Sequence, residues 1–253
     1  MATRRVKVTG GELFADIDGD GPPVVLLHSG VTDARQWEAV TRLVGRRATV
    51  IRYDRRGYGR SAKYKRGRYC ASLDLLELLD GLGLDRVVAC GNSAGGDALL
   101  EAAALQPARF ARLVLLAPAV WPWDFSPGME AFAQAEEAAL AADDLDRAVA
   151  LNLDMWVRDP AHREPVGQML RRALDNQHKR PYAEFALEDP PIGERLDAIT
   201  CPVRILVGEH DKEDFRAIAW HLADRLPDAT AEEVPDAGHL LGLEQPELVA
   251  SLL

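Results

Sequence analysis

The sequence predicts an α/β protein, with a mostly parallel sheet flanked by helices and one all-helical insertion. Short apolar runs rich in β-branched residues alternate with helical patterns over residues 1–118 and again over 201–253. Between residues 119 and 200 the patterns are helical, and no run is typical of a strand. The chain has 253 residues, which is enough to bury a full core.

The expected strands are short, and most are bounded by Pro, Gly or Asp residues. The first two are alternating runs divided by Gly10 and Gly11, so they predict an antiparallel pair. Residues 24–27 form a continuous apolar run, as in a strand buried on both faces. The expected strands are residues 4–9, 12–18, 24–27, 48–54, 86–90, 111–118, 203–209 and 230–234.

Helical patterns follow most of these strands, so the strands are expected to be parallel and the helices to cover both faces. The helices expected in the core are residues 35–46, 72–82, 93–105, 215–226 and 246–253. Those expected in the insertion are residues 129–142, 145–157 and 165–178. Residues 119–200 are therefore expected to form a helical cap over the carboxyl edge of the sheet, where α/β proteins bind ligands. Residues 1–118 and 201–253 would form the core.

Composition excludes several classes of function. A formal net charge of −10 argues against a nucleic-acid partner. The three cysteines, Cys70, Cys90 and Cys201, have no CxxC spacing, so we expect no disulfide framework, no metal site and a cytoplasmic location. No signal peptide or apolar run of membrane-spanning length is expected. We expect a small-molecule substrate, no cofactor, no membrane association and a monomer or homodimer.

One motif stands at a predicted strand-to-helix turn. Gly91-Asn92-Ser93-Ala94-Gly95 matches the G-x-S-x-G pattern, in which a serine stands on a sharp corner between small residues. The helix that follows would aim backbone N–H groups and its positive dipole at the serine. We interpret Ser93 as a nucleophile. The alternative is a serine that only caps the helix.

A nucleophilic serine needs a base, and the base needs an orienting acid. His239 follows the last predicted strand, and Asp211 follows the strand before it. Both therefore belong at the same sheet edge as Ser93, and we predict them to be the base and the acid. Asp214 is the rival acid, although it is expected to cap the helix at Phe215.

These segments together resemble the α/β-hydrolase superfamily. The matching stretches are LLHSG, YDRRGYGRS, GNSAGG, GEHD and GH, and they cover the chain end to end. The Ser93, Asp211, His239 order is that of the superfamily. Within it, the chain is most similar to small esterases and enol-lactonases. The resemblance implies an oxyanion hole made by the backbone N–H groups of Gly30 and Ala94, with His28 supporting that loop.

The resemblance implies hydrolysis of a small ester or lactone through an acyl-enzyme. Asn92, just before the serine, resembles instead the hydrolases of this fold that cleave carbon–carbon bonds. Two further alternatives stay open: a ligand-binding protein with little turnover, and an oxygen-using or perhydrolase chemistry on the same three residues.

The residues that line the substrate pocket are predicted from their place beside the motifs or at the start of the cap. For the aromatic residues, packing of the cap on the core is the alternative, and the Ser29 hydroxyl could point away from the pocket. The expected lining residues are Ser29, Asn92, Trp121, Trp123, Trp156 and Leu240.

A basic stretch, residues 55–68, holds seven Lys or Arg residues in fourteen. Such a stretch could steer an anionic substrate. Charge runs are more often solvated surface, so we expect a solvent-exposed loop that leads into a helix.

Overall fold

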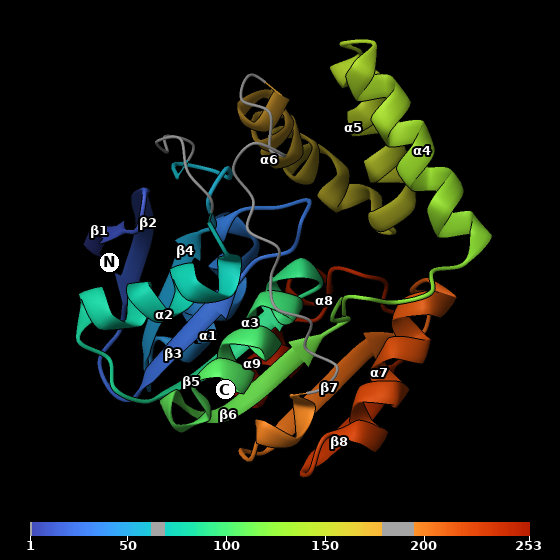
Figure 1. Cartoon of the computed structure of the whole chain (residues 1–253). Coiled ribbons are helices and arrows are strands. Elements are labelled where there is room, and N and C mark those ends of the chain that lie inside the picture. Colours follow the sequence, from blue (N-terminus) through green and yellow to red (C-terminus); the bar gives the residue numbers. More distant parts are fainter. Residues whose placement is uncertain (1, 62–68, 179–194) are drawn as a thin grey trace.

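The centre of the molecule is a single eight-stranded sheet (Figure 1). The computed structural model describes residues 2–61, 69–178 and 195–253. The strands are β1 (Ala2–Val8), β2 (Gly11–Asp18), β3 (Pro23–Leu27), β4 (Thr49–Asp54), β5 (Val87–Asn92), β6 (Phe110–Leu116), β7 (Val203–Gly208) and β8 (Ala229–Val234). Their order is β1-β2-β4-β3-β5-β6-β7-β8. Strands β3 to β8 are parallel, and β2 pairs antiparallel with both of its neighbours.

Helices cover both faces of the sheet, which confirms the predicted fold class. One face carries α2 (Ala71–Leu82), α3 (Ala94–Leu105) and α7 (Glu213–Arg225). The other carries α1 (Glu38–Val44), α8 (Leu241–Glu244) and α9 (Pro246–Ser251). Short 3-10 turns are η1 (Ala34–Trp37), η2 (Pro107–Arg109) and η5 (Leu196–Ala198).

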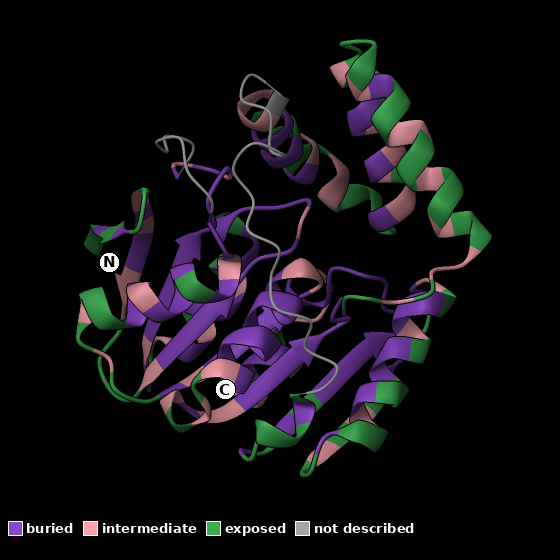
Figure 2. Cartoon of the chain, viewed as in Figure 1, coloured by how far each residue is buried: buried purple, intermediate pink, exposed green. Residues whose placement is uncertain are grey.

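Alternation along the strands builds two cores, one on each face. In β3, Val25 and Leu27 belong to the core under α2, α3 and α7, whereas Val24 and Leu26 belong to the core under α1 and α9. Successive side chains of a strand point to opposite faces, so a continuous apolar run fills both. Figure 2 shows the central strands buried along their length, while the helices expose their outer faces.

Among the described residues between β6 and β7, three helices stand apart from the sheet (Figure 1). They are α4 (Pro127–Ala141), α5 (Leu145–Trp156) and α6 (Pro160–His178). The predicted start of the third helix, at residue 165, is wrong. Pro165 lies inside α6, and Asp159 starts the helix by accepting the Ala161 N–H at 2.8 Å. Proline is a frequent first residue of a helix, but Asp159, six residues before Pro165, supplies the start here.

The predicted cap, residues 119–200, extends past these helices, and its part from 179 to 194 lies outside the described residues. Its division from the core stays a proposal. Among the helices of the described residues, none combines the length and apolarity needed to cross a membrane.

Candidate active site

Ser93 makes the turn between β5 and α3 by itself, since β5 ends at Asn92 and α3 begins at Ala94. Its backbone angles are φ 54° and ψ −121°. A non-glycine residue held at positive φ costs about 1–3 kcal/mol, and such residues cluster at functional sites. The Ser93 N–H donates to the Leu116 carbonyl of β6 at 2.9 Å, which anchors the turn. The Ser93 side chain makes no capping hydrogen bond to α3, so the helix-cap interpretation has no support.

The glycines around Ser93 are required by close approach of the backbone. A Cβ on Gly91 would lie 2.4 Å from the Gly95 carbonyl oxygen, and a Cβ on Gly95 would lie 2.5 Å from the His28 carbonyl oxygen. A Cβ on Gly96 would lie 2.9 Å from the Pro118 side chain. These contacts are shorter than van der Waals separation. The motif therefore lets strand and helix meet closely enough to raise one serine.

The structure brings His239 and Asp211 together at the carboxyl edge of the sheet. Asp211 follows β7, and His239 lies between β8 and α8. The two carboxylate oxygens lie 2.9 and 3.0 Å from His239 Nδ1, and both side chains are buried. When Nδ1 carries the proton and donates a hydrogen bond to the carboxylate, Nε2 is the basic nitrogen of the ring.

Two aromatic rings hold the imidazole from its sides. The ring centroids of Trp156 and Phe215 each lie 4.5 Å from that of His239. Trp156 comes from α5 and Phe215 from α7. The histidine orientation is therefore fixed by packing as well as by its hydrogen bond to Asp211.

Among the hydrogen bonds of the described residues, none joins Asp214 to His239 Nδ1. The prediction that Asp214 caps a helix is also wrong. It lies inside α7, whose N-cap is Lys212. Its carboxylate accepts the Ser126 N–H at 2.8 Å and the Ser126 hydroxyl at 2.6 Å. Ser126 is the N-cap of α4. Asp214 therefore fastens the start of the inserted helices to the core.

The two residues expected to form the oxyanion hole are neighbours. A Cβ built on Gly30 would lie 3.8 Å from the Ala94 Cβ. Ala94 is the first residue of α3, so its N–H has no acceptor within the helix. Gly30 lines the same cavity as Ser93. Two backbone donors beside a nucleophile can stabilise an oxyanion, with each donor lowering the barrier by about 3–4 kcal/mol.

His28 holds this loop from a fully buried position, as expected. Its Nε2 accepts the Arg55 N–H at 2.9 Å, and its Nδ1 lies 2.7 Å from the Ser29 carbonyl oxygen, so Nδ1 carries the proton. Burial, together with the nearby Arg55 guanidinium, lowers the pKa of His28 to about 3. The Arg55 side chain also donates to the carbonyls of Ala94 and Ser29.

This lowered pKa predicts a pH dependence of stability. The unfolded state binds a proton at the His28 ring near its ordinary pKa of 6.5, whereas the folded state stays neutral down to about pH 3. The free energy of unfolding is therefore expected to fall as pH drops below 6.5, by up to about 1.4 kcal/mol per pH unit from this group. Urea unfolding at pH 7, 6 and 5 measures the slope. His28→Gln should flatten it, and an equal slope in both proteins contradicts the assignment.

Asn92 and Ser29 do not line the pocket, so both of these predictions are wrong. Asn92 is fully buried, and its Nδ2 donates to the carbonyls of Leu116 and His239 at 2.8 and 3.1 Å. Gln36 Nε2 donates to Asn92 Oδ1 at 2.7 Å. Ser29 is also fully buried, and its N–H donates to Gln36 Oε1 at 3.0 Å. Both residues therefore support the site through buried hydrogen bonds and do not face the cavity.

A cavity of about 300 Å³ opens above Ser93. Core loops supply one part of its wall and the helices α4, α5 and α6 supply the rest. The lining residues are Gly30, Val31, Tyr58, Ser93, Phe132, Glu136, Leu140, Asn152, Trp156, Leu170, Leu174, Gln177 and His239. Ser93 and His239 thus face one cavity, lined by both polar and apolar side chains, that can hold a small ligand.

Of the predicted pocket residues, Trp156 lines this cavity, and Leu240, Trp121 and Trp123 do not. Leu240 is buried in the core. Trp121 is exposed and lies against Phe125, with ring centroids 5.0 Å apart. Trp123 packs on His221 instead. Proximity to a motif in the chain did not fix where these side chains point.

The lining residues that sequence analysis missed include Phe132, Glu136 and Leu140 on α4, and Asn152 on α5. The three α4 residues are spaced by four, and Asn152 is four residues before Trp156 on α5, so each set lies on one face of its helix. That spacing was present in the sequence, but it does not show which face of an inserted helix points to the site.

The basic stretch is not a solvated loop in its described part, so this expectation is wrong for residues 55–61. Arg56 is buried and donates to both carboxylate oxygens of Asp74 at 2.6 and 2.9 Å. Arg60 is paired with Asp16 and Asp54. Asp74 lies 18 residues from Arg56 and Asp16 lies 44 residues from Arg60 along the chain, so the run of charge gave no sign of these two partners. Residues 62–68 lie outside the described residues.

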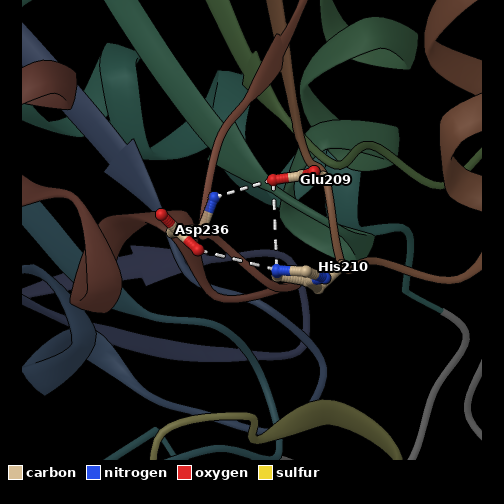
Figure 3. Close-up of side chains that lie close together, drawn as sticks. All are labelled: Glu209, His210 and Asp236. Carbon is tan, nitrogen blue, oxygen red and sulfur yellow. Dashed lines mark hydrogen bonds and ion pairs between the residues drawn. The ribbon is translucent and has the colours of Figure 1, made fainter.

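Three exposed residues connect the loops that carry Asp211 and His239 (Figure 3). His210 Nε2 lies 3.9 Å from a Glu209 carboxylate oxygen and 3.8 Å from one of Asp236. The Asp236 N–H donates to Glu209 at 3.1 Å. One ligand atom from each residue lies within 4.8 Å of the others, so these described residues could hold a metal ion. Exposed groups of this kind are also common without one.

A serine raised on a strand-to-helix turn, beside a buried aspartate–histidine pair at the carboxyl edge of a mostly parallel sheet, defines the α/β-hydrolase class. The model of the alpha/beta hydrolase family matches residues 24–252, and the chain belongs to this family. The sequence-based recognition of an esterase-like α/β hydrolase, and so of a hydrolytic enzyme, is confirmed.

Individual relatives carry names from the same range of reactions. The chain is 28% identical to 3-oxoadipate enol-lactonase 1 of Acinetobacter baylyi, over 94% of this chain and 90% of that protein. It is 25% identical to carboxylesterase YbfK of Bacillus subtilis, over 91% of this chain and 78% of the relative. The solved structure of a thermophilic esterase from Thermogutta terrifontis matches with a TM-score of 0.80 and 25% identity, over 100% of this chain and 96% of the other.

Proposed function

We propose that this protein hydrolyses a small ester or lactone through an acyl-enzyme formed on Ser93. The observation that carries the proposal is that Ser93 and His239 line one cavity while Asp211 binds the Nδ1 side of the imidazole. The ester class is supported by the relatives, which include a lactonase, a carboxylesterase and an esterase.

In the first half of the reaction, Ser93 Oγ attacks the substrate carbonyl and its proton passes to His239 Nε2. Asp211 holds the ring tautomer and stabilises the imidazolium that forms. The carbonyl oxygen becomes an oxyanion and accepts hydrogen bonds from the Gly30 and Ala94 N–H groups. The intermediate collapses when His239 gives the proton to the leaving alcohol, or to the ring oxygen of a lactone.

In the second half, water enters and His239 Nε2 takes one of its protons while the hydroxide attacks the acyl carbon. Collapse of the second oxyanion returns the proton to Ser93 Oγ and releases the acid. The turn keeps Ser93 Oγ raised throughout, since the Ser93 N–H is anchored on the Leu116 carbonyl and the flanking glycines let strand and helix meet closely.

The alternative of carbon–carbon bond cleavage was based on Asn92. Its side chain does not line the cavity and instead holds Leu116 and His239 by hydrogen bonds. No contact of Asn92 therefore favours that reaction over ester hydrolysis.

Labelling with a fluorophosphonate tests the proposed nucleophile. Intact-mass analysis should show one adduct on the wild-type protein, mapped to Ser93, and none on Ser93→Ala. An adduct that survives in Ser93→Ala, or no adduct on the wild type, contradicts the proposal. Labelling without turnover of any ester or lactone would favour the ligand-binding class.

Substrate length gives a second expected result. The cavity volume of about 300 Å³ is at the small end for ligand sites. Each methylene that still fits should raise kcat/KM about fourfold, from about 0.8 kcal/mol of burial. Among p-nitrophenyl esters from acetate to palmitate, kcat/KM should peak at a short or medium chain. A steady rise to palmitate would contradict a pocket of this limited size.

A further inference from the structure

We propose that α4 and α5 form a subsite for an alkylammonium group of the substrate, with Glu136 as the counter-charge and Phe132 and Trp156 as aromatic walls. The subsite belongs to the cavity that Ser93 lines. The inference rests on the proposed function, because it names the chemical class of the ester that the same cavity accepts.

Helical spacing brings the subsite residues together. Phe132 and Glu136 are four residues apart on α4, and Asn152 and Trp156 are four residues apart on α5. Residues at this spacing share one face of a helix. All four line the cavity, so the two facing stripes present a carboxylate, an amide and two aromatic rings to one space.

The Glu136 carboxylate is held in place but not neutralised. Asn152 Nδ2 donates to Glu136 Oε1 at 2.5 Å and to the Ala148 carbonyl at 3.0 Å. Asn152 is buried, with 3% of its surface exposed, so its amide is a fixed, uncharged support. Within residues 2–61, 69–178 and 195–253, no Lys, Arg or His side chain pairs with Glu136, and Glu136 Oε2 has no hydrogen-bond donor.

The surroundings of Glu136 strengthen its attraction for a cationic ligand. Leu140, one turn along α4 from Glu136, lines the same cavity, as do Leu170 and Leu174 of α6, and a carboxylate partly shielded from solvent interacts more strongly with a cation than it does in bulk water. A ligand ammonium would provide the charge that the described residues do not. The formal net charge of −10 also favours the approach of cations.

The aromatic walls suit the same ligand. The rings of Phe132 and Trp156 are perpendicular, at 87°, with centroids 5.6 Å apart. Cations bind to ring faces, and tryptophan is the strongest of the aromatic residues in this role. Trp156 also packs against His239. An ammonium on Trp156 would therefore lie close to the reacting groups, which fits an ester whose charge is a few bonds from the carbonyl.

A matched pair of substrates tests the inference. Acetylthiocholine and S-(3,3-dimethylbutyl) thioacetate have the same shape and differ by the charge of one quaternary centre. We expect the wild-type enzyme to prefer acetylthiocholine by about tenfold in kcat/KM. Glu136→Gln keeps an oxygen for Asn152 and removes the charge, so the ratio should fall to about one. Glu137→Gln, the same change at the neighbouring exposed position, should leave the ratio unaltered.

Binding without turnover gives a second readout. Choline and 3,3-dimethylbutan-1-ol are titrated calorimetrically into Ser93→Ala and into the Ser93→Ala, Glu136→Gln double variant. Tighter binding of choline that is lost in the double variant supports the subsite. Equal affinity of the two alcohols, or no binding of choline, overturns it. Failure of the proposed function is distinct, since it would appear as no phosphonate adduct on Ser93 whatever choline does.

Discussion

Ser93→Ala is expected to lower kcat for a short ester by about 10⁵-fold. A loss of this size is typical when a nucleophilic serine that works together with its histidine base is removed. Without Oγ no acyl-enzyme forms, and residual turnover depends on water positioned by the Gly30 and Ala94 N–H groups. Alanine has the same backbone preferences as serine to a first approximation, so the strained turn should survive. Steady-state rates with a p-nitrophenyl ester measure the loss.

Two controls make the Ser93 result specific. Ser251→Ala removes the same hydroxyl from an exposed position on α9 and should retain wild-type kcat. The melting temperature of Ser93→Ala should stay close to that of the wild type. More than about 1% residual activity in Ser93→Ala, after exclusion of contaminating enzyme, would assign the nucleophile to another group.

Asp211→Asn is expected to lower kcat by about 10⁴-fold. Asparagine fits the same space, but its amide would donate to His239 Nδ1 and place the ring proton on Nε2, where a base cannot accept another. The imidazolium would also lose its adjacent negative charge. The same ester assay measures the effect, with labelling by the phosphonate expected to slow in parallel.

Asp214→Asn is the matched control, because it makes the same change three residues along. Its carboxylate accepts from Ser126 and not from His239. The variant should lose about 1–3 kcal/mol of unfolding free energy from the weakened buried hydrogen bonds, with kcat within about tenfold of the wild type. A reversed order of effects, with Asp214→Asn the more inactive, would make Asp214 the catalytic acid.

The sequence predicted the fold well because its signals are local and repeat. The central strands are short apolar runs, and turn residues bound most of the strands. Errors arose where two local signals competed, as at Pro165, which is a frequent helix starter but follows Asp159, a better one. The helix predicted over residues 35–46 divides into η1 and α1, and the four-residue helix α8 was missed because such a short piece leaves no periodic pattern.

The carboxyl ends of the predicted strands also indicated which residues would lie close together. Ser93, Asp211 and His239 each follow a parallel strand, and parallel strands end at one edge. Pocket side chains follow no such rule. Asn92 is next to the serine in sequence, but alternation along β5 and the turn point its side chain away from the cavity. There it accepts a hydrogen bond from Gln36, which comes from another segment of the chain. Long-range partners of this kind also explain the burial of Arg56 against Asp74.

The amide pair of Gln36 and Asn92 has a consequence for how this enzyme could be redesigned. These two side chains connect the loop of Gly30, the turn of Ser93 and the carbonyl of His239, and all of them come from the core. The inserted helices supply much of the cavity wall, and Trp156 touches His239 directly. A chimera that received a different insertion, with an aromatic residue retained at 156, would therefore inherit the reaction from one parent and the substrate from the other.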